Sequence, residues 1–284
     1  MTNPRKATLP YRHSLEALRQ IDGWPAPTAA AGVAHDGEIV ASHGVENEVL
    51  RWASVTKLAT ALGALIAAEE GVIDLDEPAG PEGSTVRHLL AHASGLPFEP
   101  GAPTGRPGQR RVYSNVGFEA LAEHIAARAE MPFADYLAAG VLEPLEMNAE
   151  LRGSAASELH GTLDDLLRLA RELQRPKLVA QETLDEATTV QFPGLAGVLP
   201  DFGRFDPNDW GLGFELRDDK SPHWTGSRNS PRTFGHFGAS GTFLWVDPDA
   251  GVALGVLTDL EFGDWSKSAW PRLSDGVLEE ARSS

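Results

Sequence analysis

Two short apolar runs near the start of the chain predict a β-hairpin. Residues Ala29–Ala34 and Glu38–Ser42 have strand character, and Asp36-Gly37 between them is a preferred pair for a tight hairpin turn. Strand character returns near the end of the chain, where Asp247–Gly251 supplies a second turn signal. The late strand-like runs are Phe234–Gly235, Thr242–Val246 and Val252–Thr258.

Between these ends, apolar positions recur at helical spacing. Ser54–Glu70 is apolar on nearly all sides and is followed by Gly71, so it predicts a buried helix. Near the N-terminus, the spacing of leucine and isoleucine predicts a short amphipathic helix over His13–Ile21. Gly194–Asn229 is rich in Gly, Pro and Asp and predicts irregular structure. The remaining predicted helices are Thr85–Ala93, Val116–Glu130, Phe133–Val141, Thr162–Gln174 and Ala269–Arg282.

The order of these elements predicts an α/β (α+β) fold. Its antiparallel sheet is built from the N- and C-terminal segments and flanked by helices, and an all-α subdomain is inserted between them. We expect residues 1–74 and 190–284 to form the sheet domain with its terminal helices, and residues 75–189 to form the helical subdomain. A cleft between the sheet edge and the helical part is the natural place for a site.

The composition of the 284-residue chain narrows the classes of function. A formal net charge of −17 argues against nucleic acid as a partner, because phosphate binding needs a basic surface. The chain has no cysteine, which excludes disulfides, thiol nucleophiles and thiolate metal sites. No stretch has the apolar run of a signal peptide or of a membrane span, so we expect a cytoplasmic protein without a membrane partner.

Ser54 and Lys57 form the first candidate motif. Residues three apart share one face of a helix, so the Lys57 amine can approach the Ser54 hydroxyl and act as its base. Burial in an apolar helix lowers the pKa of a lysine and so favours the neutral amine. The alternative is structural: Ser54 as a helix cap and Lys57 as a surface residue, and the motif alone does not exclude it.

Tyr113-Ser114-Asn115 is the second candidate motif, and it follows a loop rich in Pro and Gly. A tyrosine phenol beside a lysine can relay or accept a proton, and an asparagine amide can orient a substrate carbonyl. The alternative is a core tyrosine followed by a helix cap. Whether Lys57 or Tyr113 removes the serine proton is open at this stage, since the two form a coupled pair.

His236-Phe237-Gly238 is the third candidate motif, on a predicted edge strand. His236 can face the cleft there, while Gly238 allows close approach of a substrate. The backbone N–H of Ala239 and that of Ser54 can supply two oxyanion donors. The bare pattern is common by chance in a chain with nine histidines and 29 glycines, so its context decides.

In this order and setting, the three motifs resemble those of the serine β-lactamase-like superfamily. The branch concerned holds class C β-lactamases, serine D-Ala-D-Ala carboxypeptidases and related esterases, whose motifs are Ser-x-x-Lys, Tyr-x-Asn and a late Lys/His-x-Gly. The segments Leu89–Pro97 and Trp210–Phe214 resemble two further family segments, and the likeness runs from about Ala29 to Asp259. The resemblance implies a β-lactamase/transpeptidase-like fold, acyl transfer through a Ser54 ester and no metal or organic cofactor. It also places His92 in a structural turn.

One departure from the family pattern bears on the substrate. Lactam-handling members mostly carry Lys and a hydroxyl residue in the third motif, and this chain has His236 and Phe237 there. A substrate carboxylate thereby loses a contact of about 1.5–3 kcal/mol, although Ser240 or Thr242 can partly substitute for the missing hydroxyl. Some carboxypeptidases of the family also have a histidine in the third motif. Phe237 is therefore a stronger argument than His236 against a substrate with a carboxylate.

The sequence therefore predicts a serine hydrolase, foremost a cytoplasmic esterase for a small or medium uncharged ester, with apolar contacts from the Trp and Phe residues of Gly194–Trp224. The alternatives are a D-amino-acid peptidase or weak β-lactamase, and a catalytically idle homologue that binds a partner. The expected partner is a small ester or amide, and the oligomeric state cannot be read from the sequence.

Overall fold

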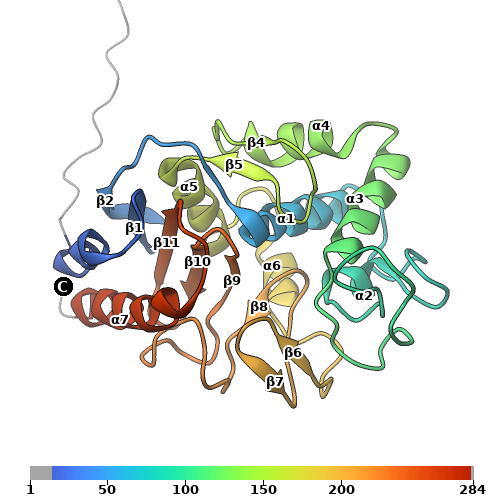
Figure 1. The fold of residues 1–284 in the computed structure, drawn as a ribbon. Coiled ribbons are helices and arrows are strands. Elements are labelled where there is room, and N and C mark those ends of the chain that lie inside the picture. Colours follow the sequence, from blue (N-terminus) through green and yellow to red (C-terminus); the bar gives the residue numbers. More distant parts are fainter. Residues whose placement is uncertain (1–14, 283–284) are drawn as a thin grey trace, which may run out of the picture.

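The computed structural model describes residues 15–282 and contains a six-stranded antiparallel sheet, most of which lies on the left in Figure 1. Its strand order is β2-β1-β11-β10-β9-β8, so strands from the two ends of the chain lie side by side. The strands are β1 (Ala29–His35), β2 (Glu38–Gly44), β8 (Glu215–Leu216), β9 (Phe234–Gly238), β10 (Thr242–Asp247) and β11 (Val252–Thr258). The predicted sheet from both termini is confirmed.

The pairing of β1 with β11 joins the two ends of the chain, from Ala29 opposite Thr258 to His35 opposite Val252. In the β1–β2 hairpin, Asp36 and Gly37 both have positive φ, at 50° and 83°. Tight hairpin turns need this geometry, and Asp-Gly adopts it easily, so the predicted turn is confirmed. Strand β9 extends three residues beyond the predicted Phe234–Gly235.

Helices cover both faces of this sheet. Helix α5 (Leu163–Gln174) packs against β1, β10 and β11, while α7 (Asp264–Ala281) and the 3₁₀ helix η1 (Glu16–Gly23) pack on the other face (Figure 1). The predicted N-terminal helix over His13–Ile21 is thus a 3₁₀ helix, and His13 itself lies outside the described residues. Helix α7 begins five residues before the predicted start.

The remaining helices gather beside the sheet, around the buried helix α1 (Thr56–Glu69) (Figure 1). Every residue of α1 from Thr56 to Ala67 is buried, as its apolar surface predicted. Helix α4 stops at Leu137 and continues as one π-helical turn, so the predicted regular helix over Phe133–Val141 is wrong in its second half. The other members are α2 (Val86–Leu90), α3 (Asn115–Ala129), η3 (Ala138–Leu142) and α6 (Gln181–Ala187).

Short strands occur where the sequence predicted none. Strand β5 (Leu159–Gly161) pairs with β3 (Leu50–Arg51) on one side and with β4 (Glu150–Leu151) on the other, so the inserted segment is not purely helical. The segment predicted to be irregular contains a hairpin of β6 (Gly197–Leu199) and β7 (Gly203–Phe205). Strands of two or three residues are too short to leave a period-two pattern.

The boundaries at residues 74/75 and 189/190 stay a prediction, and α5 lies inside this segment while packing on the sheet. Within residues 15–282, no helix combines the length and the apolar character that a membrane crossing requires.

Candidate active site

Ser54 lies in a tight 3₁₀ turn, η2 (Ala53–Val55), between β3 and the start of α1. Trp52, the residue before the turn, is fully buried. Its carbonyl accepts a hydrogen bond from the Val55 N–H and so stabilises the turn. Ala53 adopts a φ of 45°, a left-handed conformation that costs a non-glycine residue about 1–3 kcal/mol. Such strain is often concentrated at functional turns.

The Lys57 amine faces three oxygens. Its Nζ lies 3.4 Å from Ser54 Oγ, 2.6 Å from Asn115 Oδ1 and 2.9 Å from the carbonyl oxygen of Ala156. Lys57 is completely buried, and this burial lowers its pKa well below the ordinary lysine value, against a smaller opposing effect of the Glu119 charge. The neutral amine, which can accept a proton from Ser54, is therefore accessible without strongly alkaline conditions.

The Tyr113 hydroxyl is hydrogen-bonded with Ser54, and the Tyr113 ring lies 4.8 Å from the Lys57 nitrogen. Burial raises the pKa of Tyr113 above that of an ordinary tyrosine, against the smaller effect of the Ser54 hydrogen bond. Tyr113 therefore keeps its proton, while Lys57 loses its own more readily. Of the two groups that sequence reasoning left open, the geometry and these opposite shifts favour Lys57 as the base and Tyr113 as the acid.

The loop that carries Tyr113 is fixed by His92. His92 Nδ1 accepts a hydrogen bond of 3.1 Å from the Ser114 N–H, and its carbonyl accepts one of 2.8 Å from the Val112 N–H. Ser114 Oγ in turn accepts a bond of 2.8 Å from the Gly117 N–H and caps α3, which places Asn115 in the first turn. The prediction that His92 lies in a structural turn is confirmed.

Strand β9 approaches the Ser54 turn so closely that only glycine fits at position 238. A Cβ there would lie 2.6 Å from the Trp52 carbonyl oxygen and 2.6 Å from Thr242 Oγ1. Thr242 Oγ1 donates a hydrogen bond of 2.9 Å to that same carbonyl. This contact places the Ala239 backbone N–H beside Ser54, and both residues line the same cavity. The N–H groups of Ser54 and Ala239 are thus the candidate oxyanion donors.

His236 is neutral in this setting. Its Nδ1 lies 2.6 Å from the Phe237 carbonyl oxygen, which only accepts, so Nδ1 carries the proton. Burial, together with the nearby Lys57, lowers the pKa of His236 to about 3. Its Nε2 has no hydrogen-bond partner among the described residues. The third motif therefore offers no cation to a substrate.

The hydroxyls that were candidates to replace the missing one are also occupied. Ser240 Oγ donates a hydrogen bond of 2.8 Å to the Arg51 carbonyl, and Thr242 Oγ1 donates to the Trp52 carbonyl. Phe237 packs against aromatic rings that include Phe262 and Trp270, on the α7 side of the sheet. The position after His236 thus offers a substrate apolar surface and no hydrogen bond.

A cavity of about 130 Å³ lies beside Ser54, and a second of about 400 Å³ opens on the Asn115 side. The small cavity is lined by Ser54, Tyr113, Trp210, His236, Phe237 and Ala239, among others. It is smaller than the roughly 300–1,000 Å³ of sites for drug-sized ligands, so it suits a small group. The structure thus brings all seven predicted site residues to one place: Ser54, Lys57, Tyr113, Asn115, His236, Gly238 and Ala239.

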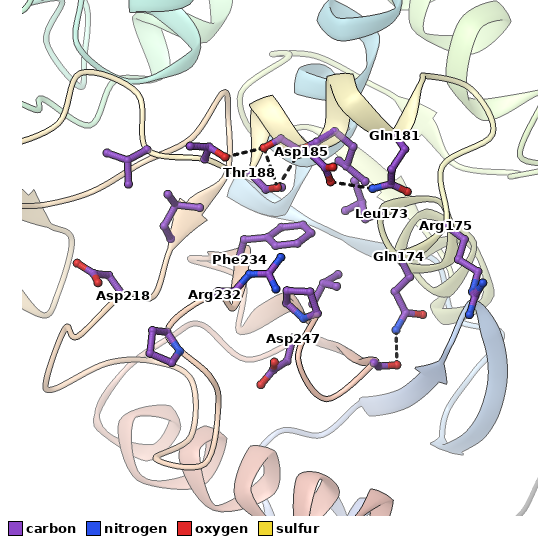
Figure 2. A pocket seen from close by; sticks show the side chains of 18 of the residues that line it. Leu173, Gln174, Arg175, Gln181, Asp185, Thr188, Asp218, Arg232, Phe234 and Asp247 are labelled. Atoms are coloured by element: carbon purple, nitrogen blue, oxygen red, sulfur yellow. Dashed lines mark hydrogen bonds between the residues drawn. The ribbon is translucent and has the colours of Figure 1, made fainter.

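A larger cavity, about 660 Å³, lies elsewhere, between α5, α6 and the edge of the sheet (Figure 2). Its polar side chains are bonded within the protein: Gln181 Nε2 donates to Asp185, and Gln174 Nε2 donates to the Gly251 carbonyl, each at 2.8 Å. It contains none of the predicted site residues, so its size alone gives no reason to place the chemistry there.

One buried charge cluster beside the site was not predicted. Glu215 lines the small cavity, and its carboxylate accepts from Lys220 Nζ at 2.5 Å, from His223 Nε2 at 3.0 Å and from Trp224 Nε1 at 3.0 Å. Burial would raise the pKa of Glu215, but Lys220 and His223 outweigh it and lower the pKa to about 2. Lys220 also donates to the Asp209 carbonyl at 2.9 Å, next to Trp210.

Comparisons with known proteins identify the family and agree with the fold. A model of the family described as Beta-lactamase matches residues 19–277. The crystal structure of a beta-lactamase from Mycobacterium bovis is 52% identical, with a TM-score of 0.92, and the match covers 93% of this chain and 99% of that one. EstCE1, described as a hydrolase with promiscuous acyltransferase activity, is 17% identical with a TM-score of 0.76 over 92% of this chain and 96% of its own, a likeness in fold alone.

A penicillin-binding protein of Bacillus subtilis is 28% identical over 36% of this chain. The match spans 30% of that protein, so less than a third of its length is represented here.

Proposed function

Because this chain belongs to the beta-lactamase family, a family of serine hydrolases, we propose that it is a carboxylic ester hydrolase that forms an acyl-enzyme on Ser54. The observation that carries the proposal is the buried Lys57 amine, 3.4 Å from Ser54 Oγ, beside a Tyr113 hydroxyl that is hydrogen-bonded with the same serine. The lowered pKa of Lys57 and the raised pKa of Tyr113 give the site one base and one acid.

Acylation begins when neutral Lys57 takes the Ser54 proton as Ser54 Oγ attacks the ester carbonyl carbon. The carbonyl oxygen becomes an oxyanion, and the N–H groups of Ser54 and Ala239 stabilise it. As the tetrahedral intermediate collapses, the bond to the alcohol oxygen breaks and Tyr113 protonates that oxygen. Lys57 returns its proton to Tyr113, so both groups end in their starting states.

Deacylation uses the same groups with water in place of the serine. Lys57 takes a proton from a water molecule while the oxygen of that water attacks the acyl carbon. The same two N–H groups stabilise the second oxyanion. When the ester bond to Ser54 breaks, the proton passes to Ser54 Oγ and the free carboxylic acid leaves. Asn115, whose Oδ1 lies 2.6 Å from Lys57 Nζ, keeps the amine in place through both halves.

We expect the substrate to be small or medium in size and uncharged next to the scissile bond. His236 is neutral, Phe237 offers no hydrogen bond, and the Ser240 hydroxyl is bonded to a backbone carbonyl. A carboxylate in this position would lose its hydration without gaining a charge-assisted contact. The rings of Trp210 and Phe237 add apolar surface to the small cavity.

Weak β-lactamase activity is the second candidate, because the 52%-identical protein carries that name. The D-amino-acid peptidase and the catalytically idle homologue remain further alternatives. One assay distinguishes all four functions. It measures the hydrolysis of 4-nitrophenyl acetate, 4-nitrophenyl butyrate, a chromogenic cephalosporin and a D-alanyl peptide by wild type and by Ser54→Ala. Ser268→Ala, at an exposed position on α7, is the matched control.

The proposal predicts faster turnover of the two esters than of cephalosporin or peptide, abolished by Ser54→Ala and retained by Ser268→Ala. Faster cephalosporin hydrolysis or D-alanine release would replace the esterase by the corresponding alternative. No turnover, together with failure of a fluorophosphonate probe to label Ser54, would indicate the idle homologue.

A further inference from the structure

An apolar groove of about 450 Å³ adjoins the catalytic cavity on the side of Tyr113. The two spaces share Phe98, Tyr113 and Pro200, so a ligand can extend from one into the other. Phe98 and Val198 line the groove and are 46% and 56% exposed, well above what large apolar side chains usually show. Clustered exposed apolar side chains with a polar rim mark a binding surface.

The walls of this groove are fixed before any ligand arrives. The β6 strand that carries Val198 is tied to the segment before Tyr113, because the Arg111 N–H donates to the Ala196 carbonyl at 2.9 Å. The buried Arg111 guanidinium donates to the carbonyls of Ala91, Asn208 and Gln191 at 2.7–3.0 Å. A preformed wall lowers the ordering cost of binding.

The charge of the groove is opposite to that of the chain. Arg110 and Arg204 line it, and no acidic residue does so among those described, although the net charge of the chain is −17. Within residues 15–282, the ion pair of Arg204 is a long contact of 3.5 Å with Asp206, in which both side chains are 68% exposed. Arg110 donates to the Thr104 carbonyl at 2.7 Å. A guanidinium has five N–H donors, so each arginine retains donors for an anion.

The second cavity beside Ser54, which Asn115 also lines, has the opposite charge. It is lined by Glu99 and Glu119, while Arg51, the one cation among the described residues that line it, is paired with Glu158 at 2.6 Å. An anionic ligand is therefore attracted to the Tyr113 side and repelled on the Asn115 side.

The position of Tyr113 decides which part of an ester enters the groove. Tyr113 is the acid that protonates the departing alcohol oxygen, so this oxygen must lie at the Tyr113 hydroxyl. The groove begins at the Tyr113 and Phe98 rings, which lie 5.8 Å apart and nearly parallel. The acyl part then extends into the other cavity, past Asn115 and Ala239.

We propose that the groove binds the alcohol part of the substrate, an apolar chain or ring with an anionic group at its far end, and that Arg110 and Arg204 bind this anion. The proposal rests on the esterase function proposed above and adds the chemistry of the leaving group. It is compatible with an uncharged neighbourhood at the scissile bond, because Arg110 and Arg204 line the groove and not the cavity beside Ser54.

The test compares 4-acetoxybenzoate with its neutral isostere 4-acetoxybenzamide in wild type and in Arg110→Gln/Arg204→Gln. The readout is the ratio of kcat/KM for the anionic ester to that for the neutral one. We expect the double variant to lower this ratio about three- to tenfold, mainly through KM, because exposed ion pairs have modest energies. Added salt lowers the wild-type ratio in the same direction. The remote control is Arg19→Gln on η1, which removes one positive charge away from the groove and keeps the wild-type ratio.

Two further arms make the result decisive. Monophenyl adipate and phenyl adipamate place the same charge difference on the acyl side, and 4-acetoxyphenyl phosphate replaces the carboxylate by a phosphate. Preference for either anion on the alcohol side, lost in the double variant, supports the proposal. An equal ratio in wild type and double variant, or a charge preference on the acyl side, would overturn it while leaving the esterase function intact. If phenyl acetate shows no Ser54-dependent turnover, the esterase function itself fails.

Discussion

Lys57 Nζ lies 2.6 Å from Asn115 Oδ1, although the two residues are 58 positions apart. This contact joins the first turn of α1 to the first turn of α3, and so connects the motif that holds the nucleophile to the motif that holds Tyr113. The amide oxygen of Asn115 only accepts, so it can hold the amine in either protonation state. Asn115 thereby keeps the Lys57 amine close to Ser54 while the amine gains and loses a proton.

The pH dependence of catalysis should follow the Lys57 amine. If neutral Lys57 is the base, kcat/KM for an uncharged ester falls as pH decreases through the pKa of Lys57, which burial holds well below the usual lysine value. The negative charge of Glu119 raises that pKa, so Glu119→Gln should lower it and move the ascending limb to lower pH. The profile of Glu123→Gln, an exposed change on the same helix, should match that of wild type. A limb that stays in place, or moves to higher pH, would contradict Lys57 as the base.

Tyr113→Phe should reduce kcat by about 10²–10⁴, the usual contribution of general acid–base catalysis. The ring, with its contacts to His92 and Phe98, is retained in this variant, so KM and the thermal unfolding temperature should change little. Steady-state kinetics with ethyl butyrate, whose alkoxide must be protonated as it leaves, alongside a thermal melt, measures both. A large loss of stability with a small loss of kcat would show that Tyr113 is structural.

Gly238→Ala should inactivate the enzyme without touching a catalytic side chain. The new Cβ would meet the Trp52 carbonyl oxygen at 2.6 Å, and backbone atoms on both sides must move to relieve this contact. We expect a loss of about 1–3 kcal/mol in the free energy of unfolding, as for other overpacked sites, and a loss of activity as Ala239 is displaced from Ser54. Gly23→Ala, where nothing lies within 4 Å of the added Cβ, should be tolerated. Full activity in Gly238→Ala would refute the oxyanion role of the Ala239 N–H.

Lys220→Met should destabilise the protein by about 3–5 kcal/mol, because it leaves the buried Glu215 carboxylate without its cation. Glu215→Gln in the same chain should restore part of that loss in denaturant titrations.

The stabilisation by the Glu215–Lys220 pair should also depend on pH. The pKa of Glu215 is lowered to about 2 in the folded protein, so the stabilisation is present at neutral pH and is lost as pH falls from about 4.5 towards 2. Equal stability of wild type and Lys220→Met would mean that the pair has no net effect.

The fold was most predictable where one strand or helix is buried along its length. Val252–Thr258 was predicted with the bounds that the structure has, and α1 differs by two residues at its start and by one at its end. Both are continuous apolar runs with clear turn or cap residues at their ends. The motif residues were predictable for another reason: their order and context along the chain resemble those of a family.

Features that depend on tertiary contacts could not be predicted from the sequence. The β6–β7 hairpin is positioned by the pairing of Arg111 with Gly197. Its strand character is not visible in the sequence, because the segment is rich in Gly and Pro. The Glu215–Lys220–His223 cluster looks like ordinary surface charge, since sequence spacing does not reveal that all three are buried. Its one sequence cue is that Glu215 directly follows the Trp210–Phe214 segment.

The formation of an ester on Ser54 is the central claim, and intact-protein mass spectrometry tests it most directly. The protein is mixed with 4-nitrophenyl butyrate, quenched in acid within the first turnovers, and compared with Ser54→Ala treated in the same way. We predict a wild-type species heavier by one butyryl group, mapped to the Ser54 peptide and absent from the variant. Turnover of the ester with no such species on Ser54, or the same adduct in Ser54→Ala, would contradict the account.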